Sequence, residues 1–339
     1  MNFTKTRGMK NPGVKFLGTG SFLPGEPITN QELLNKFPID STDKWIQENL
    51  GIKQRHFAKP SIAASHLGFE AARIAIEKAG IHPRELDRIL FCSSTSDWTS
   101  PAAASNVQAL LGADCPAEDK QVACSSFIFG LDHGMRLIAT GLRYVLVIGA
   151  DVKSRFTRED DTRLLPIFAD GAGAVVLSAC ENTEGLLFCE LWTDGTKVNN
   201  IITPAGGSAM PASVETVKRN LHSVQMNADG KQIFNDAIDA MTQLSFQVCK
   251  EVGLSTSNID LLIPHQANFG IMKAVANNLN IPLDKVVVTI SETANIVSAT
   301  LPYSLDFAYR SKRIKKGMHI LLVTAGAGYS AGAAIYKET

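Results

Sequence analysis

The order of segments in the first half of this 339-residue chain is repeated in the second half. Three pairs of segments align in the same order: "GIHPRELDRILFC" (80–92) with "GLSTSNIDLLIPH" (253–265), "GLRYVLVIGA" (141–150) with "GMHILLVTAG" (317–326), and "AGAVVL" (172–177) with "AGAAIY" (331–336). In the first pair, both segments have a glycine, an aliphatic residue after it, a Leu/Ile–Asp pair and a strand-like run. Three matches in one order predict a single structural unit that is used twice.

Helix-length and strand-length apolar segments alternate within each unit. "SIAASHLGFEAARIAIEKAG" (61–80) is typical of an amphipathic helix closed by glycine, and the β-prone "RILFC" follows it. "KQIFNDAIDAMTQLSFQVCKEVG" (231–253) repeats the glycine-terminated helix in the second half. Such alternation implies helices that cover sheets through right-handed crossovers. We therefore predict two α/β halves around a pseudo-twofold axis, with a ligand site where strand ends and helix starts converge.

Charge and composition argue against several classes of partner. The chain has 33 basic and 33 acidic residues, so nothing favours nucleic acid or an anionic membrane. The N-terminus lacks the apolar core of a secretory signal, and no apolar run is long enough to span a bilayer, so we expect a soluble cytoplasmic protein. The six cysteines include no CxxC pair and have no histidine at ligand spacing, which argues against zinc and against a disulfide framework.

Cys124 lies in "VACSSFIFG" (122–130), where the predicted strand "QVA" gives way to a predicted helix from 125 to about 140. A thiol at a helix N-terminus faces unpaired N–H groups and the positive end of the helix dipole, which favour the thiolate and make the sulfur nucleophilic. An inert buried thiol fits this segment equally well.

His265 and Asn295 are two further candidates. His265 ends the strand of "IPHQAN" (263–268), and the repeat gives it the position of Cys92 at a strand end that faces the cleft between the halves. Asn295 lies in a loop of small residues before a helix that Pro302 interrupts or kinks. A lone histidine or a turn asparagine is more often structural. A nucleophilic cysteine with a strand-end histidine and a loop asparagine nevertheless forms a set suited to thioester chemistry.

The order and spacing of five segments resemble the signature blocks of the β-ketoacyl-acyl carrier protein synthase III family, in the thiolase-like superfamily of condensing enzymes. The segments are "VACSSF", "FADGAGAVVL", "IPHQAN", "ANIVSATLPYSL" and "GAGYSAGAAI". The resemblance runs from residue 14 to the C-terminus. It implies an α/β, five-layered αβαβα fold and a homodimer. One thiolase-like half (14–182) carries the nucleophilic cysteine, and the other (183–339) carries the histidine and the asparagine.

The resemblance implies a catalytic triad of Cys124, His265 and Asn295. Cys124 would take an acyl group from an acyl-CoA or an acyl carrier thioester. His265 and Asn295 would then stabilise the enolate that forms when a malonyl group on an acyl carrier protein loses CO₂. The backbone N–H groups of Cys124 and Ala327 would hold the other oxyanion. No metal and no cofactor is implied, since coenzyme A and phosphopantetheine enter as thioester substrates.

The substrate-binding region departs from the family pattern. Trp45 matches the aromatic residue that flanks the adenine of coenzyme A, and Asn268 is assigned to the same region. The family usually has arginine at two positions of this region and glycine at two positions beside the triad, and this chain has Asn49, Gly270, Ser126 and Ala294 there. The acidic "REDDTR" (158–163) lies where a coenzyme A contact is expected.

Three functions are compatible with these residues. The complete triad favours a decarboxylating condensing enzyme, which would either initiate fatty-acid synthesis or serve a specialised pathway such as polyketide synthesis. An acyltransferase on the same fold would pass the acyl group to a hydroxyl or an amine without forming a carbon–carbon bond. A non-catalytic partner subunit of a heterodimer would be expected to lack the cysteine or the histidine.

Overall fold

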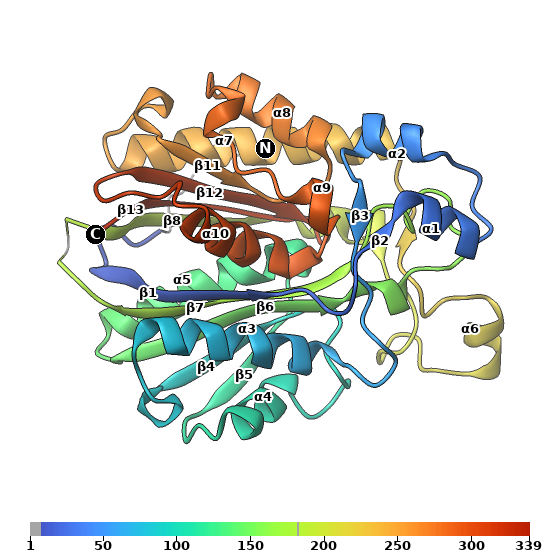
Figure 1. The fold of residues 1–339 in the computed structure, drawn as a ribbon, viewed down its shortest axis with the longest axis horizontal. Coiled ribbons are helices and arrows are strands. Elements are labelled where there is room, and N and C mark those ends of the chain that lie inside the picture. Colours follow the sequence, from blue (N-terminus) through green and yellow to red (C-terminus); the bar gives the residue numbers. More distant parts are fainter. Residues whose placement is uncertain (1–7, 182) are drawn as a thin grey trace.

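Two β-sheets with the same strand order form the framework of the protein, described here from a computed structural model that covers residues 8–181 and 183–339 (Figure 1). The first sheet has the order β1 (Val14–Phe22), β7 (Asp170–Ala179), β6 (Tyr144–Val152), β4 (Arg88–Cys92) and β5 (Ala117–Lys120). The second has the order β8 (Gly185–Thr193), β13 (Ser330–Lys337), β12 (His319–Gly326) and β11 (Leu261–Pro264). The aligned segments fall on β4 and β11, β6 and β12, and β7 and β13, which confirms the predicted repeat.

The strand directions repeat as well. β4 is parallel to β6, as β11 is parallel to β12, and in each sheet the next two pairs are antiparallel. β5 pairs in parallel with β4, and in the second sheet the corresponding place holds a single parallel bridge between Val286 and Leu262. The second sheet therefore has the same topology as the first, with a single parallel bridge in place of the edge strand β5.

Helices cover both sheets and fill the space between them, in five layers (Figure 1). α3 (Ala64–Ala79) and α4 (Ala103–Leu111) pack on the first sheet, and α7 (Gly230–Glu251) and α8 (Phe269–Asn278) lie over the second. α5 (Ser126–Ala139) and α10 (Thr300–Arg310) lie between the sheets and contact strands of both. Three apolar cores occupy the interfaces between the layers. The expected αβαβα arrangement is confirmed.

α3 shows why the layers pack closely. Its buried face includes Leu67 and Ala71, and Gly80 closes it in the left-handed conformation at φ 66°. The facing strand β1 presents Gly20, where an added Cβ would lie 2.2 Å from the carbonyl oxygen of Ala71. Glycine at this position lets the backbone of the helix rest directly on the strand.

A segment that precedes β4 in the chain packs on the second half. It contains β2 (Ile28–Thr29), α1 (Asn30–Lys36), α2 (Asp43–Leu50) and β3 (Gln54–Arg55). Ile46 and Ile52 of this segment belong to the apolar core between the second sheet and α7 and α8. In Figure 1 this segment lies beside α8 and α9 (Ile290–Thr293). Residues from both ends of the chain therefore border the same region.

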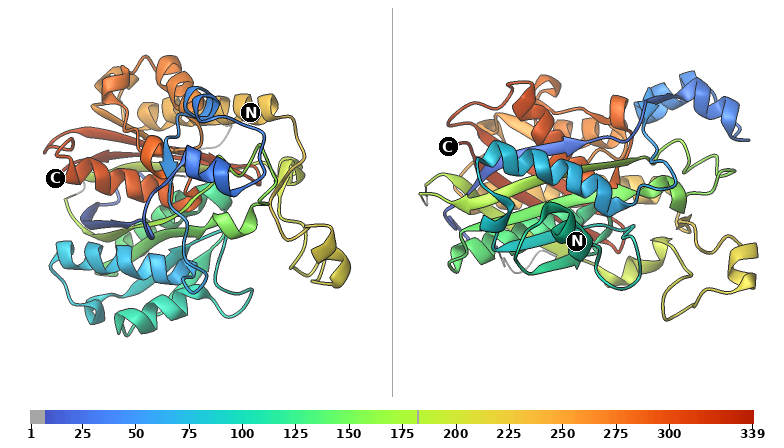
Figure 2. Two further views of the ribbon diagram at one scale, coloured as in Figure 1. Left: turned by 45° about the vertical axis from the view of Figure 1, so that its right-hand side comes forward. Right: turned by 60° about the horizontal axis from the view of Figure 1, so that its bottom comes forward.

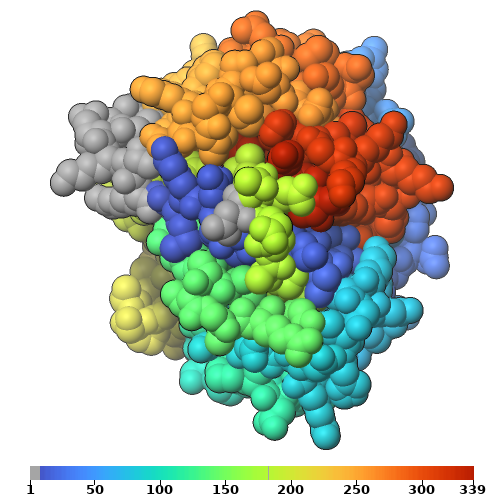
Figure 3. Space-filling model, turned by 90° about the vertical axis from the view of Figure 1, so that its left-hand side faces the viewer, coloured from blue at the N-terminus to red at the C-terminus, as the bar shows by residue number. Residues whose placement is uncertain are grey.

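The remaining elements are short. They are β9 (Ile201–Ile202), α6 (Val214–Lys218), β10 (Gln225–Met226) and seven 3-10 turns, η1 (Pro83–Glu85), η2 (Ala123–Ser125), η3 (Lys153–Phe156), η4 (Gly195–Asn200), η5 (Thr256–Asn258), η6 (Leu283–Lys285) and η7 (Val297–Ala299). α6 lies on a loop that projects from the layers (Figure 2). Seen from one end of the molecule, the yellow-green connection from β7 to β8 lies between the red and orange second half and the green and cyan first half (Figure 3). Within the described residues, every helix is too short or too polar to cross a membrane.

Candidate active site

Cys124 lies at the centre of the sharp turn η2, directly before α5. The prediction that the strand "QVA" runs up to Cys124 is wrong, because β5 ends at Lys120. The chain turns at Ala123, whose φ is +46°. Ser126 Oγ accepts a hydrogen bond from the Val122 N–H (2.7 Å) and donates one to the Ala123 carbonyl (2.7 Å). These side-chain bonds hold the turn in place of a strand ladder.

The end of the second sheet holds this turn from the other side. Thr324 Oγ1 donates to the Cys124 carbonyl (3.3 Å), and Ser125 Oγ donates to the Ser330 carbonyl (3.2 Å). A Cβ at Gly326 would lie 3.0 Å from the Cys124 nitrogen and 3.2 Å from the Cys124 Cβ. Ala327 follows at once, so the segment expected to supply the second oxyanion donor does reach the cysteine.

The electrostatic surroundings do not favour a thiolate at rest. Burial raises the pKa of Cys124 to about 12, Asp151 adds to this increase, and Lys153 acts against it. The expectation that the helix N-terminus yields a thiolate is therefore wrong for the resting protein. Desolvation is the largest contribution to the pKa of Cys124, so the thiol has to pass its proton to a base before it can attack.

His265 lies directly after β11, at the strand end predicted from the repeat. Its N–H donates to the Val323 carbonyl (2.8 Å), which aligns it with β12, the strand that contacts η2. The residue is 2% exposed, and burial lowers its pKa to about 3. The imidazole is therefore neutral across the physiological pH range, with one ring nitrogen protonated and the other free to accept.

Thr300 determines which nitrogen of His265 carries the proton. Its Oγ1 lies 2.6 Å from His265 Nδ1 and 3.0 Å from the Val297 carbonyl oxygen, and it has one hydrogen to donate. When that hydrogen goes to Val297, Nδ1 is protonated and Nε2 can accept a proton. When it goes to Nδ1, Nε2 carries the hydrogen and can donate. Our sequence analysis missed Thr300, although it is a hydroxyl residue shortly after Asn295 at the start of a predicted helix.

Asn295 is fixed between two segments. Its N–H donates to the Ile167 carbonyl (2.9 Å), and its own carbonyl accepts from the Ala169 N–H (3.0 Å). The side-chain Oδ1 accepts from the Val297 N–H (2.9 Å), so Nδ2 is left to act as a donor. The preceding residue, Ala294, has φ 52° and ψ −159°, a conformation that favours glycine and costs other residues about 1–3 kcal/mol. This conformation accounts for the glycine that the family usually has there.

The buried carboxylate of Asp151 ties the two halves together beneath these residues. It accepts hydrogen bonds from Ser94 N–H (2.9 Å), Ser94 Oγ (2.9 Å) and Thr95 Oγ1 (2.8 Å) of the first half. It also accepts bonds from the N–H (3.0 Å) and the Oγ of Ser298, in η7 of the second half. Because η2 and η7 contact each other, the structure brings the segments of Cys124, His265 and Asn295 to one place between the sheets.

Trp45 and Asn268 lie on the neighbouring helices α2 and α8. Trp45 is 48% exposed, so its ring is available for stacking. Asn268 caps α8 by accepting from the Gly270 N–H (2.7 Å), and its Nδ2 donates to the Asn49 carbonyl (3.0 Å). Both polar ends of Asn268 thus hold α2 against α8. The two positions where the family usually has arginine, Asn49 and Gly270, are the two that Asn268 joins.

Two exposed lysines border this surface, Lys53 after α2 and Lys273 on α8, and neither has an ion-pair partner among the described residues. Arg55 is fully buried and donates to the Pro166 carbonyl (3.1 Å). Arg158 is engaged by Asp160 at 2.6 Å. Lys53 and Lys273 are therefore the nearby basic residues that are free to meet an anionic arm.

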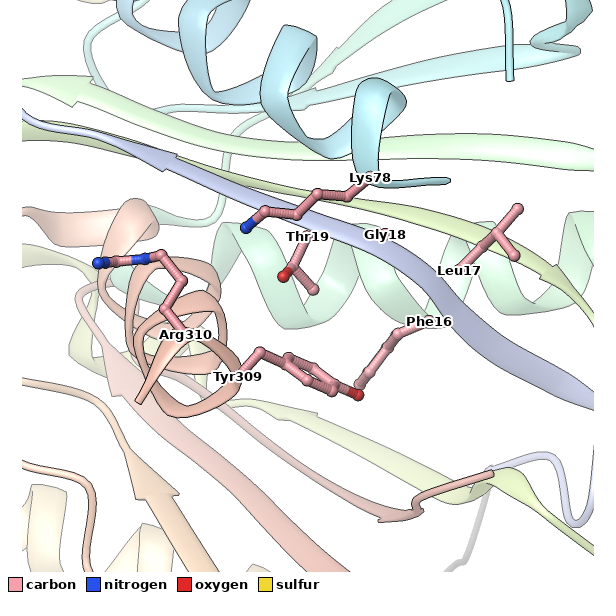
Figure 4. Close-up of a pocket in the computed structure, with 7 residues that line it drawn as sticks. All are labelled: Phe16, Leu17, Gly18, Thr19, Lys78, Tyr309 and Arg310. Atoms are coloured by element: carbon pink, nitrogen blue, oxygen red, sulfur yellow. The ribbon is translucent and has the colours of Figure 1, made fainter. Parts of the chain in front are cut away.

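A separate hollow of about 300 Å³ lies between β1, α3 and α10 (Figure 4). Its cations, Lys78 and Arg310, both pair with Asp306, at 2.7 and 2.8 Å. None of the three predicted triad residues lines it. This hollow is therefore distinct from the candidate active site, and its two cations share one carboxylate.

Comparison with known proteins identifies the family of the chain. Residues 119–195 match the family model of 3-oxoacyl-[acyl-carrier-protein] synthase III, and residues 249–337 match that of its C-terminal part. The chain is 41% identical to a β-ketoacyl-[acyl-carrier-protein] synthase III of Caldanaerobacter subterraneus subsp. tengcongensis, over 95% of this chain and 96% of the relative.

Two solved structures show the same fold over nearly the whole chain. The 3-oxoacyl-(acyl carrier protein) synthase III of Pseudomonas aeruginosa PAO1 superposes with a TM-score of 0.87 at 33% identity, over 96% of this chain and 98% of that one. The priming β-ketosynthase of the R1128 polyketide pathway gives a TM-score of 0.87 at 26% identity, over 100% and 98%. The chain belongs to the β-ketoacyl-[acyl-carrier-protein] synthase III family.

Proposed function

We propose that this protein is a decarboxylating condensing enzyme that joins an acyl group on Cys124 to a malonyl thioester. The observation that carries the proposal is the convergence of η2, His265 and the Asn295 loop around the Asp151 carboxylate. A nucleophile, a neutral imidazole and a fixed amide donor are the groups that this chemistry requires.

In the loading step, Cys124 has to lose a proton because burial raises its pKa. With Thr300 donating to Val297, His265 Nε2 is free to take that proton. The sulfur attacks the thioester carbonyl, and the N–H groups of Cys124 and Ala327 hold the oxyanion. The bond from the acyl carbon to the sulfur of coenzyme A breaks. That thiolate leaves as a thiol with the proton from Nε2.

In the condensation step, a malonyl thioester places its carbonyl against His265 and Asn295. With Thr300 donating to Nδ1, His265 Nε2–H and Asn295 Nδ2 both donate to this oxygen as CO₂ leaves and the enolate forms. The enolate carbon attacks the acyl carbon, the bond to Cys124 breaks, and the cysteine thiolate takes a proton from solvent. Between the steps, His265 releases the Nδ1 proton and takes one from solvent at Nε2, and the Thr300 hydroxyl can pair with Nδ1 in either form. One histidine can therefore serve as acceptor in the first step and as donor in the second.

Intact-mass spectrometry and CO₂ release test the two steps separately. The wild-type protein should gain one acyl mass from an acyl-CoA and release labelled CO₂ from malonyl-acyl carrier protein, and Cys124→Ala should gain no mass. A protein that loads but passes the acyl group to a hydroxyl or an amine without CO₂ release would be an acyltransferase. A protein that never loads would be a non-catalytic partner.

Loss of either donor should affect the condensation step most. Asn295→Ala should lower CO₂ release by about 10²- to 10³-fold, or about 2.7–4 kcal/mol, and leave loading nearly unchanged. His265→Ala should lower CO₂ release by a similar factor and also slow loading, because it removes the proton acceptor. Asn278→Ala, which removes an exposed amide at the C-terminal end of α8, is the matched control. Normal CO₂ release in Asn295→Ala or His265→Ala would contradict these roles.

The substrates, assembly and location complete the proposal. Acyl-CoA as donor, malonyl-acyl carrier protein as acceptor, a homodimer and a cytoplasmic location all follow from the family. The reaction as proposed needs thioester substrates and no cofactor. The named relative supports the initiation of fatty-acid synthesis, and the polyketide priming enzyme supports a specialised pathway. Trp45 is proposed to stack on the adenine of coenzyme A, with Lys53 near the charged arm.

A further inference from the structure

Lys153 is a buried cation that lies close to two aromatic rings. It is the first residue after β6 and begins η3. The residue is 8% exposed, and its Nζ lies 6.0 Å from the ring centre of Phe156 and 5.7 Å from that of Phe168. Within residues 8–181 and 183–339, its ammonium group forms no ion pair and donates no hydrogen bond.

The geometry places this ammonium group beside the candidate active site. Phe168, whose ring centre lies 5.7 Å from Nζ, pairs through its backbone with Asn295. Lys153 also follows two residues after Asp151, which binds Ser298 of η7, and its charge lowers the pKa of Cys124. Lys153 therefore lies near the loop that carries Asn295 and near the Cys124 thiol.

Asp151 does not account for the presence of Lys153. Its carboxylate accepts bonds from N–H and hydroxyl groups of Ser94, Thr95 and Ser298, and these groups come from both halves. Each of its oxygens already has at least two donors. The carboxylate is satisfied without the lysine, and the lysine is more than 4 Å away, beyond the range of a direct ion pair.

Burial lowers the pKa of Lys153, and Asp151 and Cys124 act against this decrease. A direct anionic partner would favour the ammonium form, because burying an unpaired charge is costly and a cation–π contact offsets only part of that cost. A hydrocarbon acyl chain in the same space would remove the remaining water from the ammonium group and increase that cost. A carboxylate at the far end of the acyl group would form a charge-assisted hydrogen bond with the ammonium group and so remove this cost.

We propose that Lys153 binds the terminal carboxylate of the acyl group carried by Cys124, so that the preferred acyl donors are ω-carboxyacyl thioesters, the monothioesters of dicarboxylic acids. This inference rests on the proposed function, because it assumes that Cys124 is acylated. It adds the chemical class of the acyl donor and names the residue that selects it.

The test compares donors that differ only in the terminal charge. Succinyl-CoA is paired with 4-methylpentanoyl-CoA, and glutaryl-CoA with 5-methylhexanoyl-CoA, since an isopropyl group has the shape of a carboxylate. The rate of acyl mass gain on Cys124 is measured for each donor. In at least one pair, the wild-type protein should load the carboxylate donor at least tenfold faster.

Lys153→Met keeps the length of the side chain and removes its charge. This variant should lose the preference for the carboxylate donor by at least tenfold and gain activity with the branched alkyl donor, whereas Lys153→Arg should retain the preference. Equal or faster loading of the alkyl donors by the wild-type protein would overturn the inference and leave the proposed function intact. An equal slowing of both donors in Lys153→Met would also overturn it. Failure of every thioester to load would instead contradict the proposed function.

Discussion

At the scale of single residues, burial shifts the pKa values of two groups of this site in opposite directions. Cys124 has the position at a helix start that lowers the pKa of reactive thiols elsewhere, yet its pKa is raised to about 12. His265 is shifted in the opposite sense, to about 3, for the same reason. Both groups are therefore neutral at rest, and charge appears only during the reaction.

The raised pKa of Cys124 predicts a pH dependence for its alkylation. Below the pKa, the thiolate fraction rises tenfold for each pH unit, so the rate of iodoacetamide modification at Cys124 should rise about tenfold per unit from pH 7 to pH 9. Peptide mass spectrometry with Cys124→Ser as control assigns the modified residue. A rate that levels off below pH 8 would show that the thiolate is stabilised after all.

At the scale of elements, the close approach of β12 to η2 positions the nucleophile. Gly326→Ala would place a Cβ 3.0 Å from the Cys124 nitrogen and 3.1 Å from the Ser125 nitrogen. Such overpacking typically costs about 1–3 kcal/mol, and here it would displace the turn that carries the thiol. We expect acyl loading to fall by at least tenfold.

Gly195→Ala is the matched control for that substitution, because no atom lies within 4 Å of the added Cβ. It should load at the wild-type rate. Thermal unfolding of both variants separates a local displacement from a loss of the fold. Wild-type loading by Gly326→Ala would mean that η2 tolerates movement of β12.

Asp306 joins three elements, and its pKa predicts how its contribution to the stability of the folded state depends on pH. Burial alone would raise the pKa of this carboxyl, but hydrogen bonds from Lys78 of α3, from Ser21 and Thr19 of β1, and from Arg310 lower it below its ordinary value. A carboxyl with a lowered pKa in the folded state stabilises that state above its ordinary pKa. The contribution is lost as the pH falls through the lowered value.

Asp306→Ala should therefore destabilise the protein by about 1–3 kcal/mol at pH 7, and by less near pH 3, because the hydroxyls of Thr19 and Ser21 lose their acceptor. Urea unfolding at both pH values measures the difference. Asp160→Ala, which breaks only the exposed pair with Arg158, should have a much smaller effect. An effect of Asp306→Ala that is the same at both pH values would contradict the assigned ionisation.

Sequence patterns could predict the repeated elements because periodic apolar residues mark them. The glycine-terminated α3 and the strands β6 and β12 are of this kind. The turn at Cys124 could not be predicted, since a strand-like "QVA" is overruled by two hydrogen bonds of Ser126. Cys124, His265 and Asn295 were predicted from their own segments, and the family resemblance implies that they form a triad. Thr300 and Lys153 were missed because their significance depends on contacts between distant segments.

At the scale of the whole molecule, the surface around α2 and α8 lacks the positive charge that the family usually places there. Each exposed charge pair contributes about 0.2–1 kcal/mol. Turnover of malonyl groups on the housekeeping carrier protein should therefore be weak, with a shallow dependence of kcat/KM on salt. Asn49→Arg, at an exposed position, should raise kcat/KM and steepen its salt dependence. Efficient wild-type turnover that collapses as salt rises would contradict the expectation.

The pseudo-twofold axis gives the active site a counterpart within the same molecule. Cys124 and Ser298 are the central residues of η2 and η7, and each follows a residue with positive φ, Ala123 at 46° and Val297 at 55°. His265 and Cys92 hold equivalent strand ends. Ser298 Oγ contacts the Cys92 carbonyl at 2.8 Å and the Asp151 carboxylate.

The two equivalent positions carry different groups, a thiol and an imidazole at one and hydroxyl and carboxylate groups at the other. The hydrogen bonds of Ser298 to Cys92 and Asp151 hold η7 against the first half of the chain. Substitutions at Ser298 or Asp151 should thus impair catalysis without contacting a substrate, because they loosen η7, which packs against the turn η2 that carries Cys124.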